Sequence, residues 1–171
     1  CFVGDDNDVI ETIHTAQAEQ LADDVSVTYP LLNLDKIYLD AYQQESTPGG
    51  QRCEQVNQAI NERIEKGAFL VNYTGHGGEL GWAHERILGL DDISTWTNKN
   101  KLPLFMTATC EFSRYDDPSR NSAGEEVFLK KDAGAVALFS TSRIVFTGGN
   151  MDLNEAFLAQ LFEKNPDGTR P

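Results

Sequence analysis

The sequence is poor in basic side chains and contains no long apolar run. It has 14 Lys and Arg against 27 Asp and Glu, which gives a formal net charge of −13. Nucleic acids and anionic membranes are bound through clustered Lys and Arg, so this balance argues against both kinds of partner. A basic peptide would be attracted by such a charge. Because no apolar stretch approaches the roughly 18 residues of a membrane-spanning helix, we expect no transmembrane segment.

Cysteine is also scarce. Cys1, Cys53 and Cys110 are too few for a disulfide framework, and their odd number leaves at least one free thiol. The composition is otherwise that of a globular domain, with 40% hydrophobic and 24% charged residues. The sequence shows no initiator methionine or signal peptide and opens on a strand-like segment. We therefore expect residues 1–171 to be most of one domain excised from a longer chain, whose other domains would be partners.

Strand-like and helix-like segments alternate along the chain. Short apolar runs bounded by glycine or polar residues predict strands at residues 1–4, 36–39, 68–73, 102–109 and 134–140. Apolar residues at intervals of three or four predict helices at residues 9–22, 53–67, 122–129 and 153–161, with a short one at 90–96. The alternation predicts an α/β fold: a mainly parallel sheet covered by helices on both faces, which is a three-layer α/β/α sandwich.

Two of these strands end on side chains that can act together as a nucleophile and a base. Residues 68–73 lead to His76, and residues 102–109 lead to Cys110. If the strands are parallel neighbours, both side chains emerge at the edge where open α/β sheets bind ligands. An adjacent imidazole can take the thiol proton or lower the pKa of the thiol. The glycines around His76 permit close backbone approach, so the amide N–H groups of Gly77 and Cys110 could hold an oxyanion.

The residues alone leave other interpretations open. A cysteine at a strand end is often core material, and a non-catalytic module could bind a peptide or a phosphate at residues 75–78. Zinc bound by His76, His84 and Cys110 is a weak alternative, because no paired ligand spacing supports it. Residues 5–8 are acidic or polar and fit a helix cap; calcium is possible there, but the spacing does not match an EF-hand loop. We therefore assign no metal ligand and no cofactor.

The motif Asn-Tyr-Thr-Gly-His-Gly-Gly at residues 72–78, followed 34 positions after its histidine by Cys110, resembles the catalytic core of the gingipain family of cysteine peptidases. The run at residues 102–111 is similar to the branch that contains the type IX secretion sortase. The resemblance covers most of the chain and implies a caspase-like fold and an endopeptidase that works through an acyl-enzyme. It also implies the cell surface or exterior of a Gram-negative bacterium. An autoprocessing caspase-like peptidase is a further alternative, and hydrolysis and transfer to an amine both stay open.

The resemblance also implies roles for three other residues. Asp6 falls at the position of an acidic residue that orients the catalytic histidine; gingipains carry Glu there, and Asp is one methylene shorter. Glu11 falls at the position of an acidic residue in the primary specificity pocket, where a carboxylate would favour Arg or Lys before the cleaved bond. Phe146 matches a bulky aromatic of the substrate pocket.

Sequence position adds four candidate substrate-binding residues. Trp82 is the large aromatic in the polar segment after the histidine, and we expect it to wall the cleft. Glu111 opens a loop rich in turn formers, and a loop in this place commonly shapes a binding site. Ser140 and Thr141 follow the last predicted strand and should project at the same sheet edge as the cysteine and histidine.

Overall fold

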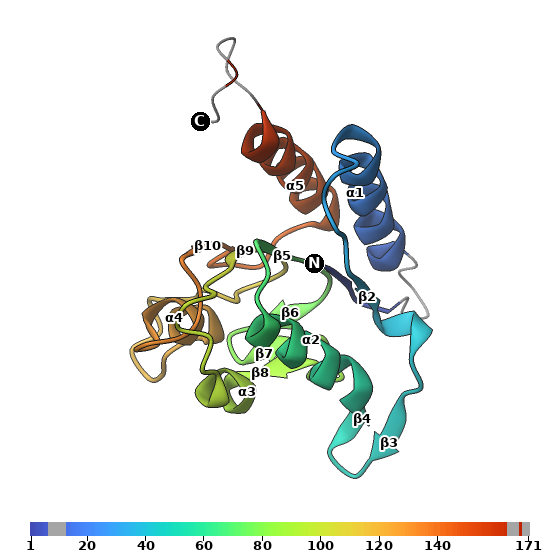
Figure 1. Ribbon diagram of the computed structural model, residues 1–171. Helices are drawn as coiled ribbons and strands as arrows, with labels where there is room; N and C mark the ends of the chain where they lie inside the picture. Colours follow the sequence, from blue (N-terminus) through green and yellow to red (C-terminus); the bar gives the residue numbers. More distant parts are fainter. Residues whose placement is uncertain (7–12, 164–167, 169–171) are drawn as a thin grey trace.

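The computed structural model describes residues 1–6, 13–163 and 168 (Figure 1). At its centre lies a sheet of five parallel strands in the order β10-β9-β5-β1-β2. These strands are β1 (Phe2–Gly4), β2 (Lys36–Tyr38), β5 (Leu70–Thr74), β9 (Leu104–Ala108) and β10 (Ala137–Phe139). The parallel sheet expected from the alternation of elements is confirmed.

Helices cover both faces of this sheet. Figure 1 shows α1 (His14–Thr28) and α5 (Thr147–Phe162) on one side. On the other side lie α2 (Glu54–Lys66), α3 (Leu90–Thr95) and α4 (Ala123–Leu129). The molecule is therefore the three-layer α/β/α sandwich predicted from the sequence. None of the described helices is both long and apolar enough to cross a bilayer.

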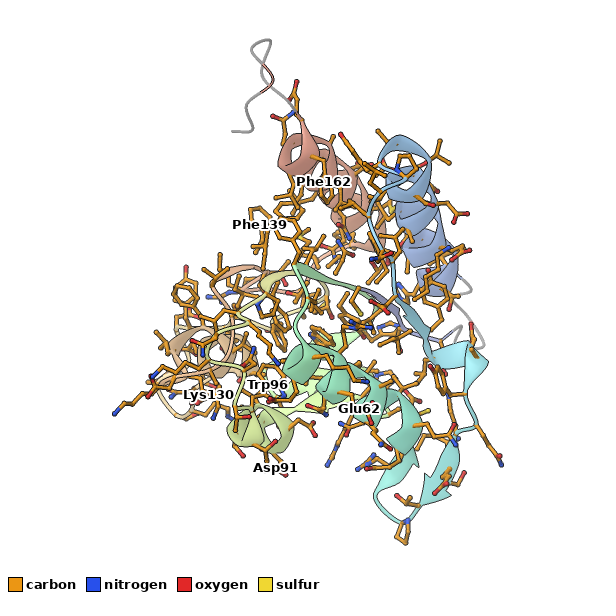
Figure 2. All side chains as sticks on the ribbon, viewed as in Figure 1. Glu62, Asp91, Trp96, Lys130, Phe139 and Phe162 are labelled. Atoms are coloured by element: carbon orange, nitrogen blue, oxygen red, sulfur yellow. The ribbon has the colours of Figure 1, made fainter. Side chains whose placement is uncertain are left out.

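Alternating strand residues build two cores. Side chains of successive strand residues point to opposite faces, so each buried strand contributes to both layers. The core under α1 and α5 contains Phe2, Leu70 and Met106, whereas the core under α2 contains Val3, Val71 and Phe105. Figure 2 shows side chains filling the space between the sheet and both helix layers. Burial on both faces explains why these strands are almost continuously apolar in sequence.

Several connections contain short antiparallel pairs that the sequence did not reveal. The segment after β2 forms a 3-10 turn, Leu39–Ala41, and then a hairpin of β3 (Glu45–Thr47) and β4 (Gly50–Arg52). The segment after His76 forms a small sheet of β6 (Gly77–Gly78), β7 (Gly81–Trp82) and β8 (Leu88–Gly89). Two-residue strands that include glycine carry no alternating apolar pattern, so periodicity could not predict them.

Two boundaries and one burial pattern also differ from expectation. Helix α1 continues to Thr28, six residues past the predicted end, because Val25 is buried between the helix layer and the sheet. Helix α5 begins at Thr147 rather than 153, since Asn150 and Asn154 face inward despite their polarity. Strand β10 is apolar in sequence but only partly buried, because it lies at the edge of the described sheet, where Phe139 is 43% exposed (Figure 2).

Candidate active site

The register of two neighbouring strands brings His76 and Cys110 to one edge of the sheet. Strands β5 and β9 pair in parallel up to Thr74 and Ala108, which lie opposite each other. His76 follows Thr74 by two residues, and Cys110 follows Ala108 by two residues. The pairing continues past the strand ends, because the Gly75 N–H donates to the Ala108 carbonyl oxygen at 3.3 Å. Imidazole and thiol therefore leave the sheet at equivalent positions on adjacent strands.

Three hydrogen bonds hold the backbone of His76. Its N–H donates to Oδ2 of Asp5 at 2.8 Å, and its carbonyl oxygen accepts from the Tyr73 hydroxyl at 2.5 Å. The Ala83 N–H donates to the same carbonyl oxygen at 2.9 Å. A side chain at Gly75 would lie 2.5 Å from the Tyr73 hydroxyl oxygen and would overlap Asp5. Glycine is thus required at this position for the loop to close on both partners.

An acidic residue that contacts His76 is Asp5, the neighbour of the expected Asp6. The Asp5 carboxylate is 1% exposed and reaches the histidine through its backbone amide. Asp6 is half-buried and accepts a hydrogen bond from the Gln44 side-chain amide instead. Strand alternation provides a signal for this: Asp5 follows Val3 by two residues and shares its face, which is the face that Tyr73 also occupies.

Burial is the main influence on the Asp5 carboxyl group. It raises the pKa of this group from its ordinary value of 3.8 to about 7, and the hydrogen bond from the His76 amide only partly opposes the shift. Asp5, Asp6 and Glu85 each place one carboxylate oxygen within 4.8 Å of the others. Hard oxygen ligands of this kind suit calcium. Three neighbouring carboxylates do not by themselves make a metal site, so no ion is assigned.

Two further histidine rings flank the imidazole of His76. The His84 ring stacks on it, with centroids 5.2 Å apart and planes 10° from parallel. The His14 ring meets it edge-on, with centroids 4.8 Å apart and planes at 83°. The sequence did not reveal either ring contact, because both contacts join residues from separate elements. Among the described residues, His76, His84 and Cys110 do not gather tightly enough to hold zinc.

The thiol of Cys110 is partly accessible. The side chain is half-buried, and Sγ lies 3.7 Å from the carbonyl oxygen of Val145, to which it donates. The next residue, Glu111, has a φ of +50°, a left-handed conformation that side chains other than glycine adopt rarely. Cys53 contrasts with Cys110, since it is 1% exposed and burial raises the pKa of its thiol. Cys53 is therefore part of the core under α2.

The loop after Cys110 is joined to the loop after β10. The Glu111 N–H donates to the Arg143 carbonyl oxygen at 3.3 Å, and the Ser113 N–H donates to the Thr141 carbonyl oxygen at 3.0 Å. The Thr141 hydroxyl donates to the Thr109 carbonyl oxygen. These bonds place Thr141 beside the residue that precedes the cysteine, while the substrate-binding roles of Glu111 and Thr141 stay predictions.

Ser140 and Phe146 border the same region in different ways. The Ser140 hydroxyl accepts from the Thr107 hydroxyl at 2.8 Å, so it joins the ends of β9 and β10. Phe146 directly follows Val145, the residue whose carbonyl faces the thiol, and its side chain is 90% exposed. Phe146 is thus one residue from the carbonyl that the thiol contacts, and its exposed ring is available to a ligand. Glu11 lies outside the described residues.

The loop after His76 packs closely on the strand end that carries Cys110. Gly77 pairs with Trp82, and a side chain at Gly77 would lie 2.5 Å from the Thr109 hydroxyl oxygen. The Arg114 side chain contributes a second connection, because its Nη1 lies 2.7 Å from the carboxylate of Glu79. Backbone proximity and an ion pair thus join the histidine loop to the cysteine loop.

Trp82 is among the residues that line the hollow beside His76, but its ring is not exposed. Its side chain is 0% exposed and stacks on Tyr73, with ring centroids 4.3 Å apart and planes 9° from parallel. It also packs on Phe105 and Phe112 in the core under α2. The polar segment around Trp82 predicts a ring that faces the cleft, whereas β7 directs the ring into the core. Trp82 therefore supports the histidine loop from the side of the core.

A hollow of about 890 Å³ opens beside His76 on the face of the sheet that α2 and α3 cover. It is lined by His76, by most of the small sheet β6-β7-β8 and by the starts of α2 and α3. Cys110 and the loop after β10 are not among its walls. The imidazole therefore borders a substantial open volume that the thiol does not line.

Comparison with solved structures shows the fold to be that of gingipains. The complex of Porphyromonas gingivalis RgpB pro- and mature domains superposes with a TM-score of 0.76 at 19% identity, covering 96% of this chain and 37% of that chain. The Arg-specific cysteine proteinase gingipain R (RgpB) gives a TM-score of 0.73 at 21% identity, covering 98% and 37%. The chain thus spans a little over a third of the length of these neighbours.

Sequence comparison identifies the family. A search of curated protein sequences found no significant match. The family profile of peptidase family C25, by contrast, matches residues 1–171, the whole chain. Its match includes the glycine-flanked His76 and the strand end at Cys110, the two features with which the sequence resembles gingipains. The chain belongs to peptidase family C25, the gingipain family of cysteine peptidases.

Proposed function

We propose that this protein is a cysteine endopeptidase in which Cys110 is the nucleophile and His76 the general base and acid. The observation that carries the proposal is the register of β5 and β9, which releases both side chains two residues after opposite strand ends. The accessible thiol of Cys110 and the fully buried one of Cys53 agree with this choice of nucleophile. Membership of family C25 supplies the reaction class.

In the proposed mechanism His76 takes the proton of the Cys110 thiol, and the sulfur attacks the carbonyl carbon of the peptide bond. The amide N–H groups of Gly77 and Cys110 hold the resulting oxyanion; donors of this kind contribute roughly 3–4 kcal/mol each in a transition state. Collapse of the tetrahedral intermediate breaks the C–N bond, and His76 gives its proton to the leaving amine. Water or another amine then attacks the thioester and releases the thiol.

The residues around His76 act as its support. Asp5 and Tyr73 fix the peptide groups on either side of the histidine Cα, and the rings of His14 and His84 limit the rotation of the imidazole. A catalytic group must be held near its productive geometry, because small displacements cost large factors in rate. In this proposal Asp5 is a positioning residue that acts through the backbone, which replaces the role expected for Asp6.

We further propose a basic residue before the cleaved bond. The net charge of −13 attracts basic peptides, and one structural neighbour is described as Arg-specific. Glu11 is the proposed pocket carboxylate, by its resemblance to the acidic pocket residue of gingipains. Phe146 would pack on the substrate side chain, and Ser140, Thr141 and Glu111 would border its backbone.

The finer role that we propose is that of a type IX secretion sortase. The run that ends in Cys110 resembles this branch of the family, whose members remove a carboxyl-terminal sorting domain from secreted proteins and attach them to surface lipopolysaccharide. Such an enzyme would work at the cell surface or outside a Gram-negative bacterium, and it would include further domains of the parent chain. Its acyl-enzyme would be resolved by an amine rather than by water.

Peptide cleavage followed by mass spectrometry tests the proposal. Wild-type protein should cleave a mixture of peptides at defined bonds, and both Cys110→Ala and His76→Ala should abolish detectable cleavage. Cys53→Ala is the matched control, because it removes a thiol from the core and should keep activity in the folded fraction. Cleavage that survives in Cys110→Ala would refute the assignment. Addition of glycine amide separates the two outcomes of the acyl-enzyme: a sortase gives the amide adduct, a hydrolase the free acid.

A further inference from the structure

The hollow beside His76 lies close to the path of the leaving part of a substrate, which is the peptide segment after the cleaved bond. In the proposed reaction His76 protonates the leaving nitrogen, so that nitrogen must come within hydrogen-bond distance of the imidazole. The peptide chain beyond the nitrogen then continues on the side of His76 away from the sulfur. His76 itself forms part of the wall of the hollow, while Cys110 and the loop after β10 do not. The hollow is thus an open volume next to the group that protonates the leaving nitrogen.

The size and the edge of the hollow suit an extended peptide. Its volume of about 890 Å³ lies near the upper end of the range for ligand sites, which leaves room for several residues. Strand β6 is an edge strand of the small sheet that lines it. A side chain at Gly78 would meet no atom within 4 Å, so the backbone of β6 borders open space. An extended chain can approach such an edge closely.

The charge of the hollow favours basic residues. Its walls contain two arginines and five carboxylates, which are Glu54, Glu79, Glu85, Asp91 and Asp92. Glu79 is engaged by Arg114, and Asp92 accepts from the Gly89 N–H at 2.8 Å. Glu54 and Asp91 are exposed on the rims that α2 and α3 form; Figure 2 shows Asp91 on α3. Within the described residues, neither carboxylate is held by a hydrogen bond or an ion pair, so both can meet cationic side chains.

We infer that the hollow lined by His76, β6-β7-β8 and the starts of α2 and α3 binds the residues that follow the cleaved bond, and that it selects basic side chains there through Glu54 and Asp91. The inference rests on the proposed peptidase function. It assigns selectivity for the residues after the cleaved bond to a surface distinct from Phe146 and the loop after β10, to which the proposed function assigns the residues before the bond.

Charge reversal combined with matched probes tests the inference. One probe carries Arg followed directly by aminomethylcoumarin, and a second carries the same acyl part followed by Ala-Lys-Ala-Lys with a quenched fluorophore. A third replaces both lysines with glutamate. The variant Glu54→Lys/Asp91→Lys reverses the rim of the hollow. The variant Asp24→Lys/Asp152→Lys makes the same change of charge on exposed residues of α1 and α5, across the sheet, and is the control.

We expect the wild-type protein to prefer the lysine probe to the glutamate probe. Reversal of the rim should lower kcat/KM for the lysine probe by about tenfold, as expected for screened charges at close range. Cleavage of the coumarin probe should stay within about twofold, because that probe has no residues to place in the hollow. Equal losses for both probes, or an equal effect of the control variant, would overturn the inference.

A binding measurement keeps the inference separate from the peptidase assignment. Fluorescein-labelled Ala-Lys-Ala-Lys with a free amino terminus should bind the Cys110→Ala protein more tightly than the glutamate peptide, and rim reversal should remove the preference. If no probe is cleaved but this binding is found, the peptidase function fails and the site stands. If the probes are cleaved but neither their cleavage nor peptide binding changes when the rim charges are reversed, the function stands and the inference fails.

Discussion

Replacement of Asp5 by Asn should change how the stability of the protein depends on pH. Asp5 is 1% exposed, and burial raises the pKa of its carboxyl group to about 7. The folded state therefore holds this proton more tightly than the unfolded state does. The associated stability is fully present below the ordinary pKa of 3.8 and is lost as pH rises through about 7. The neutral amide of Asn removes this loss and keeps an oxygen acceptor for the His76 N–H.

The size of the effect follows from the two pKa values. With values of 3.8 unfolded and about 7 folded, ionisation of Asp5 lowers the free energy of unfolding by about 3 kcal/mol between about pH 5 and about pH 8. The free energy of unfolding of Asp5→Asn, relative to the wild type, should rise by this amount over the same interval. The remaining titratable groups contribute to both proteins and largely cancel in the difference.

Urea denaturation at a series of pH values measures this difference. Tryptophan fluorescence is a suitable signal, since Trp82 and Trp96 are 0% and 4% exposed and report on the core. Asp6→Asn removes the same charge one residue along, from a half-buried side chain, and should keep most of the wild-type pH dependence. Parallel stability curves for the wild type and Asp5→Asn would refute the assignment of Asp5 as a buried, readily protonated acid.

Substitutions at three positions test other parts of the site. Gly75→Ala should destabilise the fold by about 2 kcal/mol and lower Tm by roughly 4–8 °C, because the added methyl group overlaps Asp5; an unchanged melting curve would contradict this. His84→Ala should lower kcat by about threefold to tenfold while His84→Phe, which keeps a ring stacked on His76, retains most activity; equal losses would argue against positioning. Phe146→Ala should raise KM on the order of fivefold with unchanged thermal stability, and an unchanged KM would remove this residue from the substrate site.

The main features of the fold were predictable because they depend on continuous apolar strands. The strands that end near His76 and Cys110 are buried on both faces, so their composition identifies them without any knowledge of their partners. Parallel pairing then follows from the intervening helices, and both reactive side chains are carried to the same edge. The relation between Cys110 and His76 is a consequence of topology, which the alternation of elements indicates.

The supporting residues were harder to predict because their roles depend on contacts between distant segments. Asp5 accepts from the His76 backbone amide because it lies on the side of β1 that faces Tyr73. The sequence does not reveal this, because Asp5 and Asp6 are adjacent residues of the same type. Trp82 lies in a polar segment, and only the pairing of β7 with β6 directs its ring inward. The ring of His84 meets that of His76 because of the same small sheet, whose short glycine-containing strands have no detectable period.

The rate of alkylation at each thiol is the most direct test of the central claim that His76 activates Cys110. Iodoacetamide labelling of the native protein, followed by mass spectrometry of the peptides, compares Cys110 with Cys53, which is buried and has a raised thiol pKa. We predict that Cys110 in the wild type is labelled far faster than Cys53 near neutral pH, and that His76→Ala removes most of this advantage. Labelling of Cys110 at the same rate in the wild type and in His76→Ala would contradict the account.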